Sequence, residues 1–136
     1  MMLHATAVLK DLPELYGVRK IFFDAWYDGP VSGLAEHDGH ERRFIMVTND
    51  EPGGTWDLEP RVYVLHSLPP ARLAEAWESH RAFAAAGLPG CLHQPPCPER
   101  DDAEPLEALW ERCPPEPDEP YADEPMIGWF RDTEAA

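Results

Sequence analysis

The chain has 136 residues, and its 26 acidic side chains outnumber its 11 lysines and arginines, which gives a formal net charge of −15 at pH 7. This balance disfavours direct binding to nucleic acid, which requires positive charge. Hydrophobic residues make up 43% of the chain, so one domain with a packed core is expected. No apolar stretch approaches the roughly 18 residues of a membrane span. With no visible signal peptide, we expect a cytoplasmic protein that does not contact the membrane.

Charge and proline divide the sequence into two parts. Residues 1–98 contain 13 acidic and 8 basic residues, whereas residues 99–136 contain 13 acidic and 3 basic residues. Ten of the 16 prolines lie from Pro89 onward. We therefore predict a folded domain over 1–98 and an acidic, proline-rich C-terminal segment over 99–136. The apolar cluster at 126–130 favours docking of that segment on the sheet of the domain, because a free cluster would form an exposed apolar patch.

Alternation of apolar and polar residues predicts the strands, and a weaker alternation over 3–10 also favours a strand. Asp38-Gly39 separates two of the predicted strands, and this dipeptide is typical of a two-residue hairpin turn because both residues must adopt positive φ. The four clearer strands cover residues 18–28, 32–37, 40–47 and 61–68.

Helical spacing begins after the fourth predicted strand. Pro69-Pro70 opens a helix in which apolar residues recur at intervals of three and four, and Gly87 is a plausible C-cap. A second short helix is predicted over 105–112. The expected fold is therefore α+β: an antiparallel four-stranded sheet with one main helix packed on a face, followed by the proline-rich acidic segment.

One stretch of the sequence resembles a loose set of small uncharacterised bacterial proteins. The segment 22–39, FFDAWYDGPVSGLAEHDG, contains an aromatic-Asp-Gly-Pro-x-Ser-Gly motif followed by a hairpin turn. The later helix with Trp77, His80 and Phe83 is similar to theirs as well. The resemblance covers roughly residues 18–90 and implies a bacterial origin and a compact α+β fold. It assigns no activity and no catalytic residue.

Two carboxylates flank a tryptophan on one face of the first clear strand. Asp24, Trp26 and Asp28 alternate along that face and are followed by a glycine- and proline-rich turn. The first interpretation is structural: these residues end the strand and stabilise the turn. If they are functional, we expect a recognition patch, since tryptophan is enriched at binding hot spots. The alternative is a small hydrolase that uses the two aspartates for acid–base catalysis.

Cysteine and histidine cluster after the main helix. Cys91, His93, Cys97 and Cys113 have the ligand inventory of a Cys₃His zinc site, although their spacing is not that of a common zinc finger. The same residues also fit reduced, partly packed thiols with a surface histidine. His80 lies on or near the apolar stripe of the helix, a position typical of a histidine at the edge of the core. A nucleophilic pair of Cys91 with His80 or His93 is a further alternative, without support from any flanking motif.

The leading functional interpretation is a non-enzymatic acidic protein that binds a basic protein partner, as an immunity protein, antitoxin or inhibitor does. Asp24, Trp26 and Asp28 of the strand and Tyr121 and Trp129 of the C-terminal segment are its candidate binding residues. No cofactor is expected under this interpretation. The alternatives are a zinc-binding protein that uses the Cys/His residues and the hydrolase with paired aspartates.

Overall fold

The computed structural model describes residues 3–4, 10–26, 29–48, 61–112 and 124–131, and its fold is α+β, as predicted. The described strands are β1 (Leu3–His4), β2 (Arg19–Trp26), β3 (Pro30–His37), β4 (His40–Thr48), β5 (Val62–His66) and β6 (Met126–Arg131). The described helices are α2 (Pro70–Ala85) and α3 (Leu106–Arg112). Neither of these helices has the length and apolar character needed to cross a membrane.

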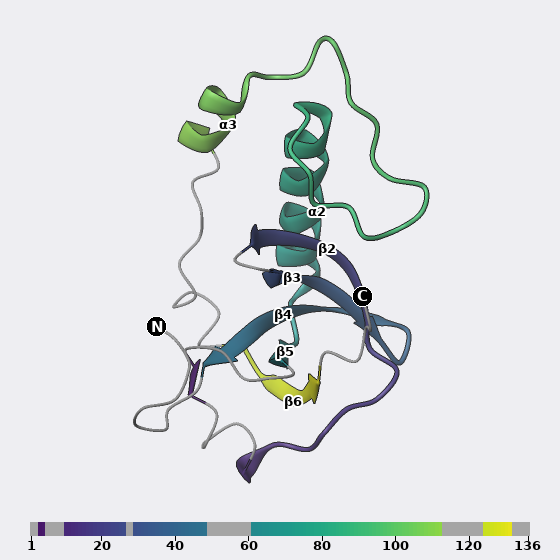
Figure 1. Cartoon of the computed structure of the whole chain (residues 1–136), viewed down its shortest axis with the longest axis vertical. Helices are drawn as coiled ribbons and strands as arrows, with labels where there is room; N and C mark the ends of the chain where they lie inside the picture. Colours follow the sequence, from purple (N-terminus) through teal and green to yellow (C-terminus); the bar gives the residue numbers. More distant parts are fainter. Residues whose placement is uncertain (1–2, 5–9, 27–28, 49–60, 113–123, 132–136) are drawn as a thin grey trace.

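Five strands form an antiparallel sheet in the order β2-β3-β4-β5-β6, and β1 pairs in parallel with the end of β4. The strands stack one above the other in Figure 1, with β2 and β6 at the two ends of the stack. Four strands were predicted, so the sheet is larger than expected by β6. This strand contains the apolar cluster expected to dock on the sheet; it pairs with β5 from Val62 opposite Arg131 to His66 opposite Met126.

The central hairpin has the predicted turn. Asp38 and Gly39 adopt φ of 54° and 79°, and His37 pairs with His40 on either side of them. Positive φ at both positions is the requirement of the type I′ turn, which matches the right-handed twist of the strands. The second predicted helix is also present, as α3.

Two apolar clusters cover the two faces of the sheet. The first packs against Leu73, Ala76 and Trp77 of α2, so the predicted main helix does cover one face. Trp77 also donates an indole hydrogen bond of 2.8 Å to the Glu41 carboxylate of β4. Buried members of the first cluster are Ile21, Phe22, Leu34, Ile45, Val47, Val62, Val64, Leu68 and Trp129. Buried members of the second are Ala35, Phe44, Met46, Tyr63, Leu65 and Phe130.

Short extended segments cover both outer strands. Residues 13–15 run beside β6, where the Leu15 amide donates to the Trp129 carbonyl at 2.7 Å. At the other end of the sheet the chain doubles back after α2 and reaches β2 (Figure 1). There the Phe23 amide donates to the Gly90 carbonyl, and the Leu92 amide donates to the Ile21 carbonyl, both at 2.9 Å. The second segment is the start of the loop that contains the candidate site.

Candidate metal centre

His80 reaches the sheet from the third turn of α2. Its side chain is buried, with 8% of the residue exposed, and its ring stacks on Phe22 of β2 at 4.1 Å between centroids and 7° between planes. Trp77, one turn earlier on the helix, contacts the same phenyl ring edge-on at 5.2 Å. These aromatic contacts fix the imidazole against β2, with Nε2 directed toward the loop that follows the helix.

Residues 90–97, here called the ligand loop, supply three further side chains. Cys91 forms an antiparallel bridge with Phe22, which places its thiol beside His80. The Nδ1 atom of His93 lies 2.9 Å from the Pro95 carbonyl oxygen, which makes Nδ1 the protonated donor and leaves a lone pair on Nε2. The Cys97 amide donates to the Cys91 sulfur at 3.3 Å, which holds the two cysteines of the loop close together.

The four side chains converge on one point. The Nε2 atom of His80 lies 3.4 Å from the Cys91 sulfur and 3.4 Å from the Nε2 atom of His93. The Cys97 sulfur lies 3.7 Å from the same His93 nitrogen, and all four donor atoms fall within 4.8 Å of one another. We call His80, Cys91, His93 and Cys97 the His/Cys cluster. Within the part of the chain that the structure describes, no other group of three or more potential ligands converges in this way.

These separations match the edges of a tetrahedron around zinc. Zinc bonds of about 2.1 Å to nitrogen and 2.3 Å to sulfur place two donors of a tetrahedral site about 3.4 Å apart for two nitrogens and about 3.6 Å apart for nitrogen and sulfur. The observed 3.4 Å between the histidines and 3.7 Å from Cys97 to His93 agree with those values. Three donor pairs therefore lie at or near the tetrahedral edge, and all four donor atoms lie within 4.8 Å of one another.

The protonation states also suit a metal. Burial, followed by the proximity of His93 and Arg81, lowers the pKa of His80 to about 4, so its imidazole is neutral at pH 7. Burial and the hydrogen bond with Cys91 raise the pKa of the Cys97 thiol. A metal ion requires the thiolate, so zinc binding displaces the proton from this cysteine.

The structure brings together three of the four ligands predicted from the sequence, namely Cys91, His93 and Cys97. Cys113 lies outside the described residues, and the fourth place beside the other three is taken by His80. The sequence pattern places His80 on the apolar stripe of the helix, and it is indeed buried there. From the sequence, a pair of Cys91 with His80 is predicted only as a nucleophile, and His80 is not among the predicted metal ligands.

Among the candidate binding residues that the structure describes, the two tryptophans lie far apart. Trp26 is 60% exposed on β2, whereas Trp129 is 7% exposed on β6, at the opposite end of the sheet. The carboxylate of Asp24 accepts hydrogen bonds from Ser32 at 2.5 Å and from Arg43 at 2.6 Å, so it has a structural role in joining three strands. Asp28 and Tyr121 lie outside the described residues.

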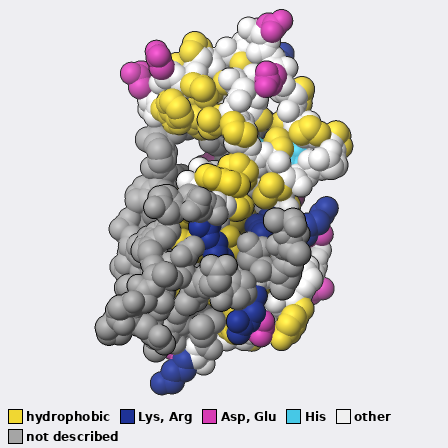
Figure 2. Space-filling model, viewed as in Figure 1, with side chains coloured by type: hydrophobic (Ala, Val, Ile, Leu, Met, Phe, Trp, Pro, Cys, Tyr) yellow, Lys and Arg dark blue, Asp and Glu magenta, His cyan; other side chains and the backbone are white. Residues whose placement is uncertain are grey.

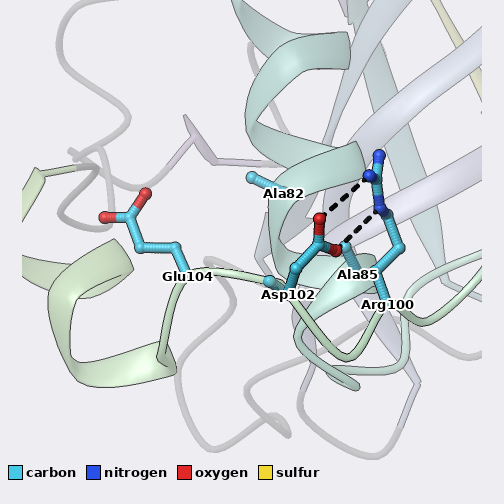
Figure 3. Close-up of a pocket in the computed structure, with 6 residues that line it drawn as sticks. Ala82, Ala85, Arg100, Asp102 and Glu104 are labelled. Atoms are coloured by element: carbon cyan, nitrogen blue, oxygen red, sulfur yellow. Dashed lines mark hydrogen bonds and ion pairs between the residues drawn. The ribbon is translucent and has the colours of Figure 1, made fainter.

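A shallow hollow of about 340 Å³ lies between the end of α2 and the segment that leads to α3. Arg100 and Asp102 line the hollow and are joined by two hydrogen bonds. The Glu104 side chain points away from them (Figure 3). The other lining residues are Ala82, Ala85 and Ala103. Figure 2 shows hydrophobic side chains gathered over α2 and α3 around this region, with acidic side chains at their margin. The Arg100 guanidinium is already paired with the Asp102 carboxylate through two nitrogens. We therefore do not consider this hollow a candidate site.

Comparison of the chain with protein-family models, with curated proteins and with solved structures finds no match. Support for a metal site therefore comes from the His/Cys cluster itself. Its strength is the combination of donor type, donor spacing and the hydrogen bond that orients His93.

Proposed function

We propose that this protein binds one zinc ion through His80, Cys91, His93 and Cys97. The proposal is supported by the convergence of the four donor atoms within 4.8 Å, with three of their separations close to the edges of a tetrahedral Cys₂His₂ site. Two thiolates and two imidazoles favour zinc over magnesium and calcium, which prefer oxygen donors. The two thiolates also neutralise the charge of the ion.

The site has the form of a structural centre. All four positions of a tetrahedral ion are supplied by the protein, so no position is left for a substrate or a reactive water. The ligand loop buries few side chains of its own, and Leu92, Gln94, Pro95 and Pro96 are exposed. A metal would supply the free energy that apolar burial does not supply in this segment.

The cluster is poorly suited to the alternative of a cysteine nucleophile. Such an enzyme needs a histidine that takes the thiol proton and remains charged beside the thiolate. His80 lies 3.4 Å from the Cys91 sulfur, but its buried position lowers its pKa to about 4, so it does not hold a proton at pH 7. A neutral imidazole is the form of histidine that binds a metal, and the neighbouring cysteine becomes a thiolate when the metal displaces its proton.

The test is metal content together with ligand substitution. Protein purified without a histidine tag should contain one zinc per chain by elemental analysis, and cobalt should replace it with the visible bands of a tetrahedral thiolate complex. Cys97→Ser and His80→Asn should each abolish these bands. Cys113→Ser is the matched control and should retain them, since the four ligands are complete without that residue. Loss of metal in Cys113→Ser with retention in His80→Asn would show that the ligand set is wrong.

Binding to a basic protein is a second candidate function. It is supported by the net charge of −15 and by Trp26, a large aromatic side chain that is 60% exposed on an outer strand. A pull-down from the native host at low and high salt tests it. A basic protein that is retained at low salt, released at high salt and lost in Trp26→Ala would support this function. Equal retention by the variant would contradict the role of Trp26.

A further inference from the structure

The His/Cys cluster lies directly against the outer edge of β2. Cys91 is both a cluster member and the residue that bridges to Phe22 of that strand. The two hydrogen bonds that cover the edge flank this bridge: Phe23 donates to Gly90, and Leu92 donates to Ile21. A ligand of the metal therefore occupies the middle of the segment that closes the sheet.

The same residue of β2 also contacts the cluster from the helix side. The ring of His80 stacks on Phe22, and Cys91 lies opposite Phe22 in the bridge, so two members of the cluster meet the sheet at this one residue. Gly90 strengthens this fit because a side chain there would place its Cβ 2.9 Å from the Phe23 carbonyl oxygen. Only a residue without a Cβ allows such a close approach.

From this arrangement, and resting on the proposed zinc site, we infer that metal occupancy controls the outer edge of β2. With zinc bound, the ligands join α2, the ligand loop and β2, and the backbone groups of Ile21 and Phe23 are covered. Without zinc, two hydrogen bonds must order an exposed, proline-rich loop, and the conformational entropy of the loop opposes them. The loop then separates from β2 and the edge becomes available for pairing, which is how exposed edge strands recruit other chains.

Thermodynamic linkage makes the coupling reciprocal: if zinc stabilises the edge contact, the edge contact must strengthen zinc binding. Leu92 offers a matched pair of variants, because its side chain is 41% exposed while its amide donates to Ile21. Leu92→Pro removes the donor, and Leu92→Ala keeps it. Neither substitution changes a ligand.

We expect Leu92→Pro to weaken zinc binding by about two- to tenfold, the range for loss of one hydrogen bond, and Leu92→Ala to change it by less than about twofold. Equal affinities for the two variants would overturn the inference. Competition with a chromophoric zinc chelator measures both.

Amide hydrogen exchange of the full chain provides the direct test, with zinc content measured on the same samples. Removal of zinc should accelerate exchange at Phe23 and Leu92 by at least about tenfold, with less than about twofold change at the central strands β4 and β5. One bound zinc with unchanged exchange at both amides would overturn the inference and leave the proposed function intact. Uniform loss of protection across the sheet would also overturn it, since zinc would then control folding as a whole. Absence of zinc binding would overturn both proposals.

Discussion

The two outer strands of the sheet are covered in different ways. Residues 13–15 are held beside β6 by backbone hydrogen bonds and by Trp129, a largely buried residue whose indole donates to the Leu12 carbonyl at 2.9 Å. The ligand loop is held beside β2 by two backbone hydrogen bonds and by the His/Cys cluster. Apolar burial at the first contact does not depend on a bound ion, whereas a metal site responds to metal supply, pH and oxidation. If the cluster binds zinc as proposed, the contact at β2 depends on the metal, whereas the contact at β6 does not.

The largest effect is expected at the β6 edge. Trp129→Ala should lower the free energy of unfolding by about 3–5 kcal/mol, because it removes a buried indole and its hydrogen bond. Trp26→Ala, on the opposite outer strand and 60% exposed, is the control and should cost less than about 1 kcal/mol. Urea denaturation of the zinc-loaded proteins measures both. Similar losses in the two variants would contradict the view that apolar burial holds the β6 side.

The second effect concerns zinc. At free zinc a thousandfold above its dissociation constant, the metal should add about 4 kcal/mol to the free energy of unfolding. Cys97→Ser should abolish this increment, whereas Trp129→Ala should retain it wherever the variant folds, since that residue lies at the other end of the sheet. Urea denaturation with and without chelator measures the increment. An increment that persists in Cys97→Ser would place the ion elsewhere.

The third effect is a pH dependence of the metal-free protein. His80 has a pKa of about 4 in the folded state against 6.5 for the free side chain, because burial disfavours its charged form. As pH falls from 6.5 to 4, the unfolded chain takes up a proton on His80 that the folded chain does not. The contribution of His80 to folding stability is therefore lost within this pH range. The loss should be on the order of 2–3 kcal/mol. Denaturation midpoints of wild type and His80→Phe across this range test it, and parallel curves would contradict the assignment.

The smallest effect concerns the link between α2 and the sheet. Trp77→Phe keeps an aromatic ring against Phe22 but removes the indole hydrogen bond to Glu41. We expect a cost of about 1 kcal/mol, the net value of one such bond. Zinc stoichiometry should not change, because the helix still presents His80. Loss of zinc in this variant would show that Trp77 positions His80, which would extend the metal centre by one residue.

Much of the fold follows from local sequence patterns. The Asp38-Gly39 hairpin, the start of α2 after Pro69 and the position of α3 all match their predicted places. Each depends on dihedral preferences or on periodicity within a short window, which a single sequence contains in full. The strand β6 was not predicted as a strand because its six residues include Gly128 and follow a proline-rich stretch, so its local signal is weak.

The members of the His/Cys cluster also differ in how far the sequence alone could identify them. Cys91, His93 and Cys97 fall within a stretch of seven positions, so their shared ability to bind a metal could be predicted from the sequence. His80 lies eleven residues before Cys91, on a helix whose pattern identifies it only as a buried side chain. Its place in the cluster depends on the chain doubling back so that Cys91 pairs with Phe22, a contact between residues 69 positions apart.

The sequence by itself determined the acidic balance, the local elements and the grouping of two cysteines and one histidine in one loop. Only the tertiary structure decided that β6 completes the sheet and that His80 joins the cysteines. The physical reason is that turns and helices depend on dihedral preferences within a few residues, whereas strand pairing and ligand convergence depend on contacts between distant segments. Those contacts form only when the sheet buries its faces and its two edges find partners.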